Sequence, residues 1–262
     1  MSLFRCFLAA LVLAITPAAA QGVDVGCRPE MALGRPRIIQ AALAEKELRL
    51  SFIGHASFLI ETPRNVKAVT DYNDYVRGNV IPDIATMNKA HSTHFSRLPQ
   101  QGITHLLPGW NRNGGKIDHD ITLLDLRVRN VSTNIRSWGG EGTEYNGNSI
   151  FIFEFGDLCV VHLGHLHHTL EPSHIRAIGR ADIVLAPVDS GLTMDIDGML
   201  DVLKSLSPRV VIPMHFFGQQ TLEKFIRLGA ERYVIDRRET PIAVFSRETL
   251  PEKPTMVVLP GR

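Results

Sequence analysis

Three short segments carry histidines where apolar runs end, and they constrain the fold of this chain more than any other feature. They are His91-Ser92-Thr93-His94, His162-Leu163-Gly164-His165 and Val211-Ile212-Pro213-Met214-His215. An apolar run followed by an abrupt polar turn is typical of a strand that ends at the edge of a sheet. Neutral imidazole is a good ligand for zinc and similar divalent ions. The pattern therefore predicts several strand ends that deliver imidazoles to one metal site.

The candidate metal ligands are the five histidines of these segments: His91, His94, His162, His165 and His215. A catalytic zinc needs about three protein ligands and keeps one position open for water, so five histidines exceed the requirement. The alternative is that these are scattered surface or core histidines, which is the better interpretation for any single one. Their shared context, a strand followed by a polar turn, favours the metal site.

Length and charge limit the class of protein. With 262 residues, of which 44% are hydrophobic, the chain has enough apolar material for one large domain with a substantial core. The formal net charge is +1, and the charged residues are spread along the chain without a long basic run. This pattern gives no electrostatic footprint for nucleic acid, which we do not expect as a partner.

The first twenty residues have the parts of a secretory signal peptide. Arg5 gives a positive start, the run Cys6–Ile15 is apolar, and small residues lead up to Ala20. The apolar run is shorter than the roughly 20 residues that span a bilayer. We therefore expect cleavage after Ala20 and an exported protein, periplasmic or secreted, with no stable membrane span in the mature chain.

Loss of this segment leaves Cys27 and Cys159 as the cysteines of the mature chain. Two alternatives stay open. In an oxidising compartment the two thiols form a disulfide, or Cys159 is a buried free thiol between Leu158 and Val160. Pairing geometry is not readable from sequence.

Periodicity predicts an α/β protein. Residues 21–46 form a lead-in segment that includes a helix-like stretch, Ile38–Lys46, and residues 47–262 form one domain. Strands are expected at Leu48–Ile53, Ser57–Glu61, Val66–Thr70, Ile84–Met87, Thr104–Leu107, Ile121–Val128, Ser149–Phe155, Leu158–His162, Ile183–Ala186 and Val210–Ile212. Helices are expected at Glu171–Ile178, Asp195–Leu206 and Gln220–Leu228. Strand runs followed by alternating helices and strands indicate two packed sheets with helices outside.

Several segments, taken in order, resemble the metallo-β-lactamase superfamily of hydrolases. Ile53–Glu61 looks like the opening strand-turn-strand of the branch that contains ascorbate phosphate lactonase-like and N-acyl phosphatidylethanolamine phospholipase D-like proteins. Val69-Thr70-Asp71 looks like the strand that ends in the structural Asp of this branch, and Leu185–Val188 and Val211–His215 are similar to its later segments. The likeness covers about Leu48 to Gly218 and implies a four-layer αββα sandwich with a metal-dependent hydrolytic site.

The metal motif departs from this family at its carboxylates. The family motif is His-x-His-x-Asp-His, and here His91 and His94 match its second and fourth positions. Lys89 replaces the first histidine, and Thr93 replaces the aspartate. In the next motif, His165 stands where the bridging carboxylate is expected. Without bridging carboxylates a second cation loses its charge compensation, so we expect one zinc ion, with a second ion or another divalent metal as the alternative.

The resemblance also implies roles for individual residues. His91, His162 and His165 would form a three-histidine site, and His94 and His215 would complete it or form the remnant of a second site. Asp71 is expected to orient a ligand histidine by accepting its other ring proton.

The catalytic candidates are Asp71, Lys89 and His94. Thr93 is no proton acceptor, so Asp71, His94 or another histidine behind the ligands would take over that role. Lys89 would contact an anionic substrate group or extend into solvent. His55 is expected to be structural, with a place in the cleft as the alternative. His167 and His168 are alternative ligands, hydrogen-bond partners of a neighbour or residues that line the cleft.

Together these features predict an exported metal-dependent hydrolase, with zinc as the expected ion. Metal-activated water would attack an ester, lactone, amide or phosphodiester bond of a small molecule. The alternative is a non-catalytic descendant that binds metal or a ligand, and the two replaced carboxylates support it. The sequence leaves the substrate and the oligomeric state open.

Overall fold

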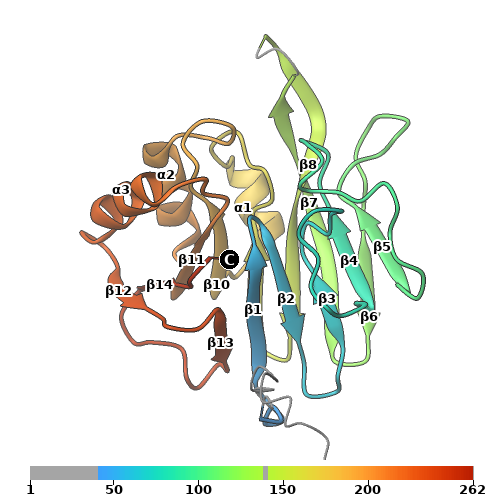
Figure 1. Cartoon of the computed structure of the whole chain (residues 1–262). Coiled ribbons are helices and arrows are strands. Elements are labelled where there is room, and N and C mark those ends of the chain that lie inside the picture. Colours follow the sequence, from blue (N-terminus) through green and yellow to red (C-terminus); the bar gives the residue numbers. More distant parts are fainter. Residues whose placement is uncertain (1–40, 138–140, 262) are drawn as a thin grey trace, which may run out of the picture. The chain divides into compact units, whose positions relative to one another are not determined.

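Two β-sheets that pack face to face frame the structure, a computed structural model in which residues 41–137 and 141–261 are described (Figure 1). The six-stranded sheet has the order β13-β1-β2-β3-β4-β5. Its strands are β1 (Leu48–Gly54), β2 (Ser57–Glu61), β3 (Lys67–Val69), β4 (Ile84–Met87), β5 (His105–Pro108) and β13 (Ile242–Phe245). The eight-stranded sheet has the order β12-β14-β11-β10-β9-β8-β7-β6. Its strands are β6 (Asp120–Leu123), β7 (Leu126–Arg136), β8 (Thr143–Phe155), β9 (Leu158–His162), β10 (Ile183–Pro187), β11 (Val210–Met214), β12 (Val234–Arg237) and β14 (Thr255–Val258).

Strand direction brings the histidine segments together. Strands β9, β10 and β11 run parallel, so their carboxyl ends lie at one edge of the eight-stranded sheet. In the other sheet β1 and β3 are both antiparallel to β2, and β4 is parallel to β3. The ends of β1, β3 and β4 therefore share an edge as well. Central strands β10 and β11 are buried along their whole length, which explains their continuous apolar sequences.

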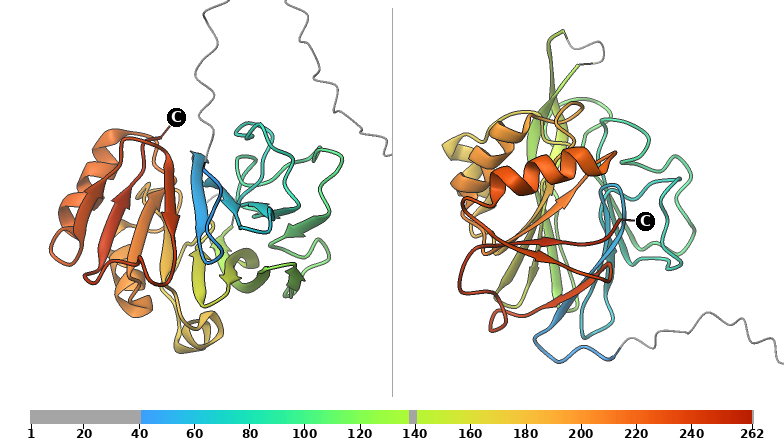
Figure 2. Two further views of the ribbon diagram at one scale, coloured as in Figure 1. Left: turned by 90° about the horizontal axis from the view of Figure 1, so that it is seen from below. Right: turned by 60° about the vertical axis from the view of Figure 1, so that its left-hand side comes forward.

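Apolar side chains fill two layers. The first lies between the sheets and includes Phe58, Phe151 and Phe153. The second joins the outer face of the eight-stranded sheet to the helices α1 (Pro172–Ile178), α2 (Ile196–Leu206) and α3 (Gln219–Gly229) (Figure 2). Asp195 caps the start of α2, since its side chain accepts a hydrogen bond from the backbone of Gly198.

The outer face of the six-stranded sheet is covered differently. Val69, Tyr72 and Met87 form a small cluster there, and Phe95 and Trp110 from the following loops pack against it. In the part of the chain that the structure describes, loops rather than a helix thus cover this face. The predicted α/β sandwich is confirmed, and its helical layer lies on the eight-stranded sheet.

Most expected elements are present within a few residues of their predicted bounds, although β8 begins at Thr143 and not at Ser149 as expected. Three further differences stand out. The expected single strand Ile121–Val128 is wrong, because the chain reverses at Leu124 (φ 54°) and forms the antiparallel hairpin β6–β7. The helix-like stretch Ile38–Lys46 is not helical at residues 41–46, and residues 38–40 lie outside the described ones. Strands β12, β13 and β14 were not expected from the sequence.

The expected signal peptide and most of the lead-in segment also lie outside the described residues. Cys159 has no disulfide partner among the described residues, and Cys27 is not one of them, so their pairing stays a prediction. Within residues 41–137 and 141–261, every helix is too short or too polar to cross a lipid bilayer.

Candidate metal centre

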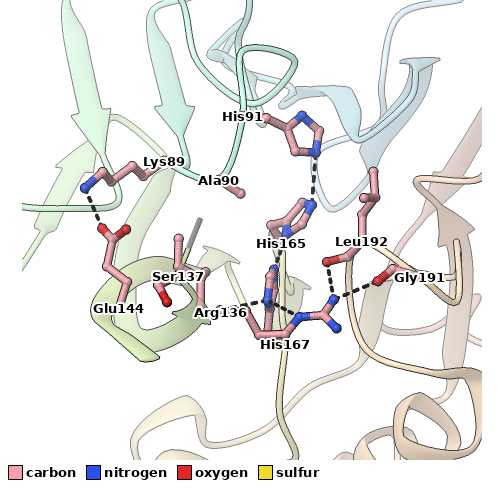
Figure 3. Close-up of a pocket in the computed structure, with 11 residues that line it drawn as sticks. Lys89, Ala90, His91, Arg136, Ser137, Glu144, His165, His167, Gly191 and Leu192 are labelled. Carbon is pink, nitrogen blue, oxygen red and sulfur yellow. Dashed lines mark hydrogen bonds and ion pairs between the residues drawn. The ribbon is translucent and has the colours of Figure 1, made fainter. Parts of the chain in front are cut away.

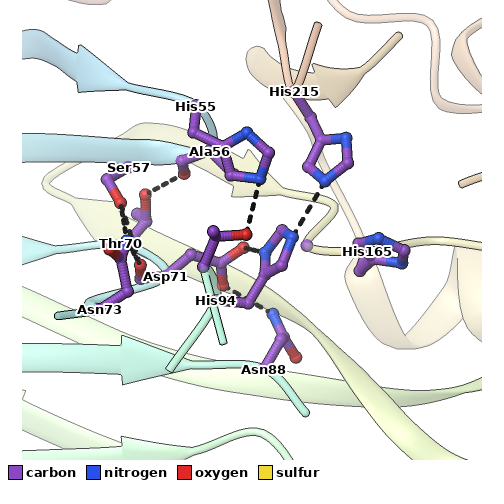
Figure 4. A network of polar contacts seen from close by, with 12 residues as sticks. His55, Ala56, Ser57, Thr70, Asp71, Asn73, Asn88, His94, His165 and His215 are labelled. Carbon is purple, nitrogen blue, oxygen red and sulfur yellow. Dashed lines mark hydrogen bonds and ion pairs between the residues drawn. The ribbon is translucent and has the colours of Figure 1, made fainter. Parts of the chain in front are cut away.

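Four histidines converge where the edges of the two sheets meet. His55, His91, His94 and His215 each offer one ring nitrogen, and these four nitrogens lie within 4.8 Å of one another. Figure 4 shows His55, His94 and His215 close together. His55 follows β1, His91 and His94 follow β4, and His215 follows β11. His55 and His215 adopt left-handed backbone conformations, with φ of 54° and 55°. Such abrupt turns at strand ends aim both rings into the cluster, and backbone strain of this kind concentrates at functional sites.

A buried carboxylate fixes the orientation of His94. Its Nδ1–H donates to Asp71 Oδ2 at 2.5 Å, and both side chains are fully buried. Asn88 donates to the other carboxylate oxygen of Asp71 at 2.9 Å. Burial raises the pKa of Asp71 and holds the pKa of His94 well below its ordinary value. A carboxylate oxygen accepts from the Nδ1–H, and a neutral imidazole carries one proton, so the Nε2 of His94 carries a lone pair.

A second buried carboxylate does the same for His215. The Nδ1–H of His215 donates to Asp189 Oδ1 at 3.0 Å. Asp189 also accepts hydrogen bonds from the backbone of Gly191, Leu192 and Thr193 and from the Thr193 hydroxyl. Burial alone would raise the pKa of Asp189, but the hydrogen bonds from His215 and Thr193 outweigh it and hold this pKa below its ordinary range.

The consequence is that two lone pairs face each other. His94 Nε2 and His215 Nε2 are 3.0 Å apart, and the N–H of each ring already donates a hydrogen bond to a carboxylate. Two acceptors at this distance need a cation to satisfy both. Histidines held by carboxylates in this way are typical metal ligands, so these residues fit a divalent ion.

Thr93, which stands in place of the family aspartate, connects two of the histidines. Its Oγ1 lies 2.7 Å from His91 Nδ1 and 2.9 Å from His55 Nε2. His91 Nε2 is then directed into the cluster, 3.0 Å from His165 Nε2. Burial is the largest factor that lowers the pKa of His91 and that brings the pKa of His55 down to about 4, so both rings are neutral at pH 7.

His165 lies beside the cluster, and a further histidine stands behind it. The ring of His165 packs edge-on against those of His91 and His94, with centroids 4.7 and 4.8 Å apart. Its Nδ1 is 2.5 Å from His167 Nε2, and His167 in turn contacts Arg136 (Figure 3). His168 accepts a hydrogen bond from the backbone of Asn134 through Nε2.

The structure keeps His162 out of the cluster, contrary to the ligand role expected from the sequence. Its Nε2–H donates to the carbonyl oxygen of Ala56 at 2.9 Å, and its Nδ1 accepts from the backbone of Gly164 at 3.1 Å. Both ring nitrogens are thus used by the backbone, and the side chain is fully buried. His55, which was expected to be structural, lies in the cluster instead.

A pocket of about 510 Å³ opens next to the cluster, and Lys89 lies at it. The Lys89 ammonium forms an ion pair with Glu144 at 2.5 Å, and both side chains are part-exposed (Figure 3). Ile135 and Leu192 give the pocket an apolar wall. Glu144 and Asp189 were not recognised as site residues from the sequence. Asp189 carried one usable signal, since it follows the apolar strand β10 by two residues.

Comparisons with known proteins agree with this geometry. The Beta-lactamase superfamily domain matches residues 49–215. A UPF0173 metal-dependent hydrolase of Thermoplasma acidophilum is 31% identical over 122 residues, which is 46% of this chain and about half (49%) of that protein. A UPF0173 metal-dependent hydrolase of Salinibacter ruber is 25% identical over 194 residues, 64% of this chain and 84% of that protein.

Solved structures show the same fold. One is a protein of Thermotoga maritima that is proposed to be a Zn-dependent hydrolase of the metallo-β-lactamase superfamily. It aligns over 82% of this chain and over its own full length, with a TM-score of 0.62 and 23% identity. A metallo hydrolase of Ignicoccus hospitalis aligns over 71% of this chain and 91% of that chain, with a TM-score of 0.51 and 19% identity.

The chain therefore belongs to the β-lactamase superfamily. Its fold is that of the metallo-β-lactamase type, its relatives are metal-dependent hydrolases, and its histidine cluster fits a metal ion; the substrate is open. The resemblance in the sequence to this superfamily is confirmed.

Proposed function

We propose that this chain is an exported hydrolase that uses one zinc ion, held by His91, His94 and His215. The observation that carries the proposal is the convergence of their three Nε2 lone pairs, two of which are set by buried carboxylates. Three neutral nitrogens and one open position form a common ligand set of catalytic zinc. The Nε2 of His55 faces the Thr93 hydroxyl, so we assign His55 to the support of His91 rather than to the ligand set.

Two features argue for one ion rather than two. Neither Thr93 nor His165 carries a charge that would compensate a second divalent cation. The carboxylates of the site, on Asp71 and Asp189, are already bound to His94 and His215. A second ion would therefore lie among neutral donors, close to the first and without an anion between them.

A zinc ion at this position would polarise the scissile bond and activate water as the nucleophile. The chain's own residues hold the ligands and shape the pocket. Asp71 and Asp189 lock His94 and His215 in one tautomer, and Thr93 holds His91. Lys89 places a positive charge at the pocket, where it would meet an anionic group of a small ester, lactone, amide or phosphodiester.

The test is turnover of a panel of chromogenic esters, lactones, amides and phosphodiesters, with a β-lactam included, before and after treatment with a chelator. We expect turnover of at least one bond class, loss of it with the chelator and recovery with zinc. His94→Ala should abolish it, and His174→Ala, in helix α1, is the matched control. Turnover that survives both the chelator and His94→Ala would refute the proposal.

The replacement of two family carboxylates supports a second candidate function, that of a non-catalytic metal-binding protein. Thr93 offers a hydroxyl where the family has its proton-accepting aspartate, and His165 offers an imidazole where it has a bridging carboxylate. Stoichiometric zinc binding without turnover of any substrate in the panel would favour this alternative.

A further inference from the structure

We propose that His165 is a hydrogen-bond donor of this site and not a metal ligand, and that His167 and Arg136 fix it in that role. The inference rests on the proposed metal centre, which it deepens by assigning the residue at the place of the family's bridging carboxylate. A chain of hydrogen bonds, followed inward from Arg136, carries it (Figure 3).

The first link fixes the proton of His167. The backbone N–H of Arg136 lies 2.9 Å from His167 Nδ1, and the Nε–H of the same arginine lies 3.2 Å from it. Both groups only donate, so Nδ1 must be the acceptor. A ring that accepts at Nδ1 carries its proton on Nε2.

The second link passes this constraint to His165. His167 Nε2 is 2.5 Å from His165 Nδ1. Since His167 donates from Nε2, His165 must accept at Nδ1, and its own proton therefore lies on Nε2. That N–H points at His91 Nε2, 3.0 Å away. A protonated nitrogen has no lone pair for a metal, so His165 is excluded as a ligand in this arrangement.

The remaining links are consistent with this direction. His91 accepts at Nε2 and donates from Nδ1 to the Thr93 hydroxyl, which donates to His55 Nε2. In this series of hydrogen bonds each N–H or O–H donates to one acceptor, and no two donors or two acceptors face each other. The opposite direction would point the Nδ1–H of His167 at both N–H groups of Arg136, so that donors would face donors.

The side chain of Arg136 is itself held in place by hydrogen bonds. Its guanidinium donates to the carbonyl oxygens of Gly191, Leu192 and Thr193 at 2.7, 2.7 and 2.8 Å. The backbone N–H groups of the same three residues hold Asp189, which orients His215. One short loop thus sets the proton positions of His165 and of His215, with opposite results: Nε2 carries the proton in His165 and the lone pair in His215.

This arrangement gives His165 a use in hydrolysis. If His91 held a zinc ion through Nε2, the Nε2–H of His165 would lose its acceptor at the wall of the 510 Å³ pocket. His165 would then be able to donate to a substrate oxygen on which negative charge develops. A donor at this position also repels a second cation, in contrast to the carboxylate of the family.

The direct test is the ring protonation of His165 and His167, observed by nitrogen NMR of the full-length, ¹⁵N-histidine-labelled protein without metal and with zinc. We expect both rings to be protonated at Nε2 in both states. In His167→Ala we expect the Nδ1-protonated form of His165 to appear, and it should be absent in the control His174→Ala. A His165 ring that is protonated at Nδ1 in the parent protein would overturn the inference.

Zinc affinity gives a second, independent readout. His165→Gln keeps an N–H donor, so we expect one ion per chain and a Kd within about tenfold of the parent value, as for a residue outside the ligand set. His94→Ala should weaken binding far more. A comparable loss in His165→Gln would make His165 a ligand and overturn the inference. If the parent binds no zinc, the proposed function fails, and the NMR measurement still decides the role of His165.

Discussion

The histidines of this site differ in which ring nitrogen is protonated, and the hydrogen-bond partners of each ring decide it. Carboxylates hold the protons of His94 and His215 on Nδ1. Backbone groups occupy both nitrogens of His162. The sequence identified histidines at strand ends, but not these partners, because contacts such as the one between His162 and Ala56 join residues that are far apart in the chain. This is why His162 was expected among the ligands and His55 was not.

Loss of the second carboxylate should weaken metal binding. In Asp189→Asn the amide no longer favours the Nδ1–H form of His215, and we expect the zinc Kd to rise about 10- to 100-fold. Isothermal titration against zinc measures it. Asp195→Asn, at the start of helix α2, is the control for a changed aspartate outside the site. Equal affinities in Asp189→Asn and the parent would show that Asp189 does not act on the metal.

The neutral histidines make the stability of the metal-free protein depend on pH. Burial is the largest cause that lowers the pKa of His55 and of His167 from 6.5 to about 4, and the guanidinium of Arg136 adds to it for His167. The unfolded chain takes up these protons near pH 6.5, whereas the folded chain resists until about pH 4. The free energy of unfolding should therefore be fully retained above pH 6.5 and fall as the pH drops from 6.5 to 4.

Urea unfolding of the chelated protein at pH 7.5, 6.5, 5.5 and 4.5 measures this trend. Asp71 acts in the opposite direction, since burial raises its pKa, but it is outnumbered by the histidines. His167→Gln should reduce the slope below pH 6.5. A free energy of unfolding that stays constant over this range would contradict the buried neutral state of the cluster.

At the scale of elements, parallel strands and abrupt turns place the site. The ends of β9, β10 and β11 supply one side, and the ends of β1, β3 and β4 supply the other. Strands β10 and β11 were predictable because their apolar runs are continuous, and β1 because apolar and polar residues alternate in its first half. Strand β12 was not, because its end residues are exposed, its two central residues are only partly buried, and it lacks an alternating pattern. The hairpin β6–β7 was missed because Leu124, at its turn, is not a typical turn residue.

The turn that carries His165 should be sensitive to a single methyl group. Gly164 has φ of 62°, and a Cβ there would lie 2.4 Å from Asn148 Oδ1 and 2.5 Å from Asn88 Nδ2. Gly156 has a similar φ of 55° with no atom within 4 Å of such a Cβ. We expect Gly156→Ala to cost about 1 kcal/mol of unfolding free energy from the backbone alone, and Gly164→Ala to cost clearly more.

Thermal or urea unfolding of both variants measures the difference, and zinc titration shows whether the site is displaced. Asn88 also holds Asp71, so a shift of its side chain reaches His94. We therefore expect weaker zinc binding in Gly164→Ala only. Equal unfolding free energies for the two variants would mean that the close contacts at Gly164 are relieved without cost.

At the scale of the whole molecule, the fold class and the superfamily were predictable because motif order survives even where single ligands change. The ligand set was less predictable, because Lys89, Thr93 and His165 replace family residues and their new partners arise only in three dimensions. Arg136 and His167, for example, are 31 residues apart in the sequence, and they meet through the backbone N–H group of Arg136.

Export is a prediction for the whole chain. If residues 1–20 are a signal peptide, the mature protein begins at Gln21, because cleavage follows the small residues that end at Ala20. Mass spectrometry of the protein from the periplasm or medium of a bacterial host gives its N-terminus. A chain that retains Met1 in the cytosol would contradict export and leave the metal centre unaffected.

The central claim is a single zinc ion on His91, His94 and His215, and metal content per chain tests it most directly. Inductively coupled plasma mass spectrometry of protein purified without added metal should give about one zinc per chain. His94→Ala and His215→Ala should lose the ion, and His165→Gln should keep it. Two ions per chain, or none after reconstitution with zinc, manganese and iron, would contradict the claim.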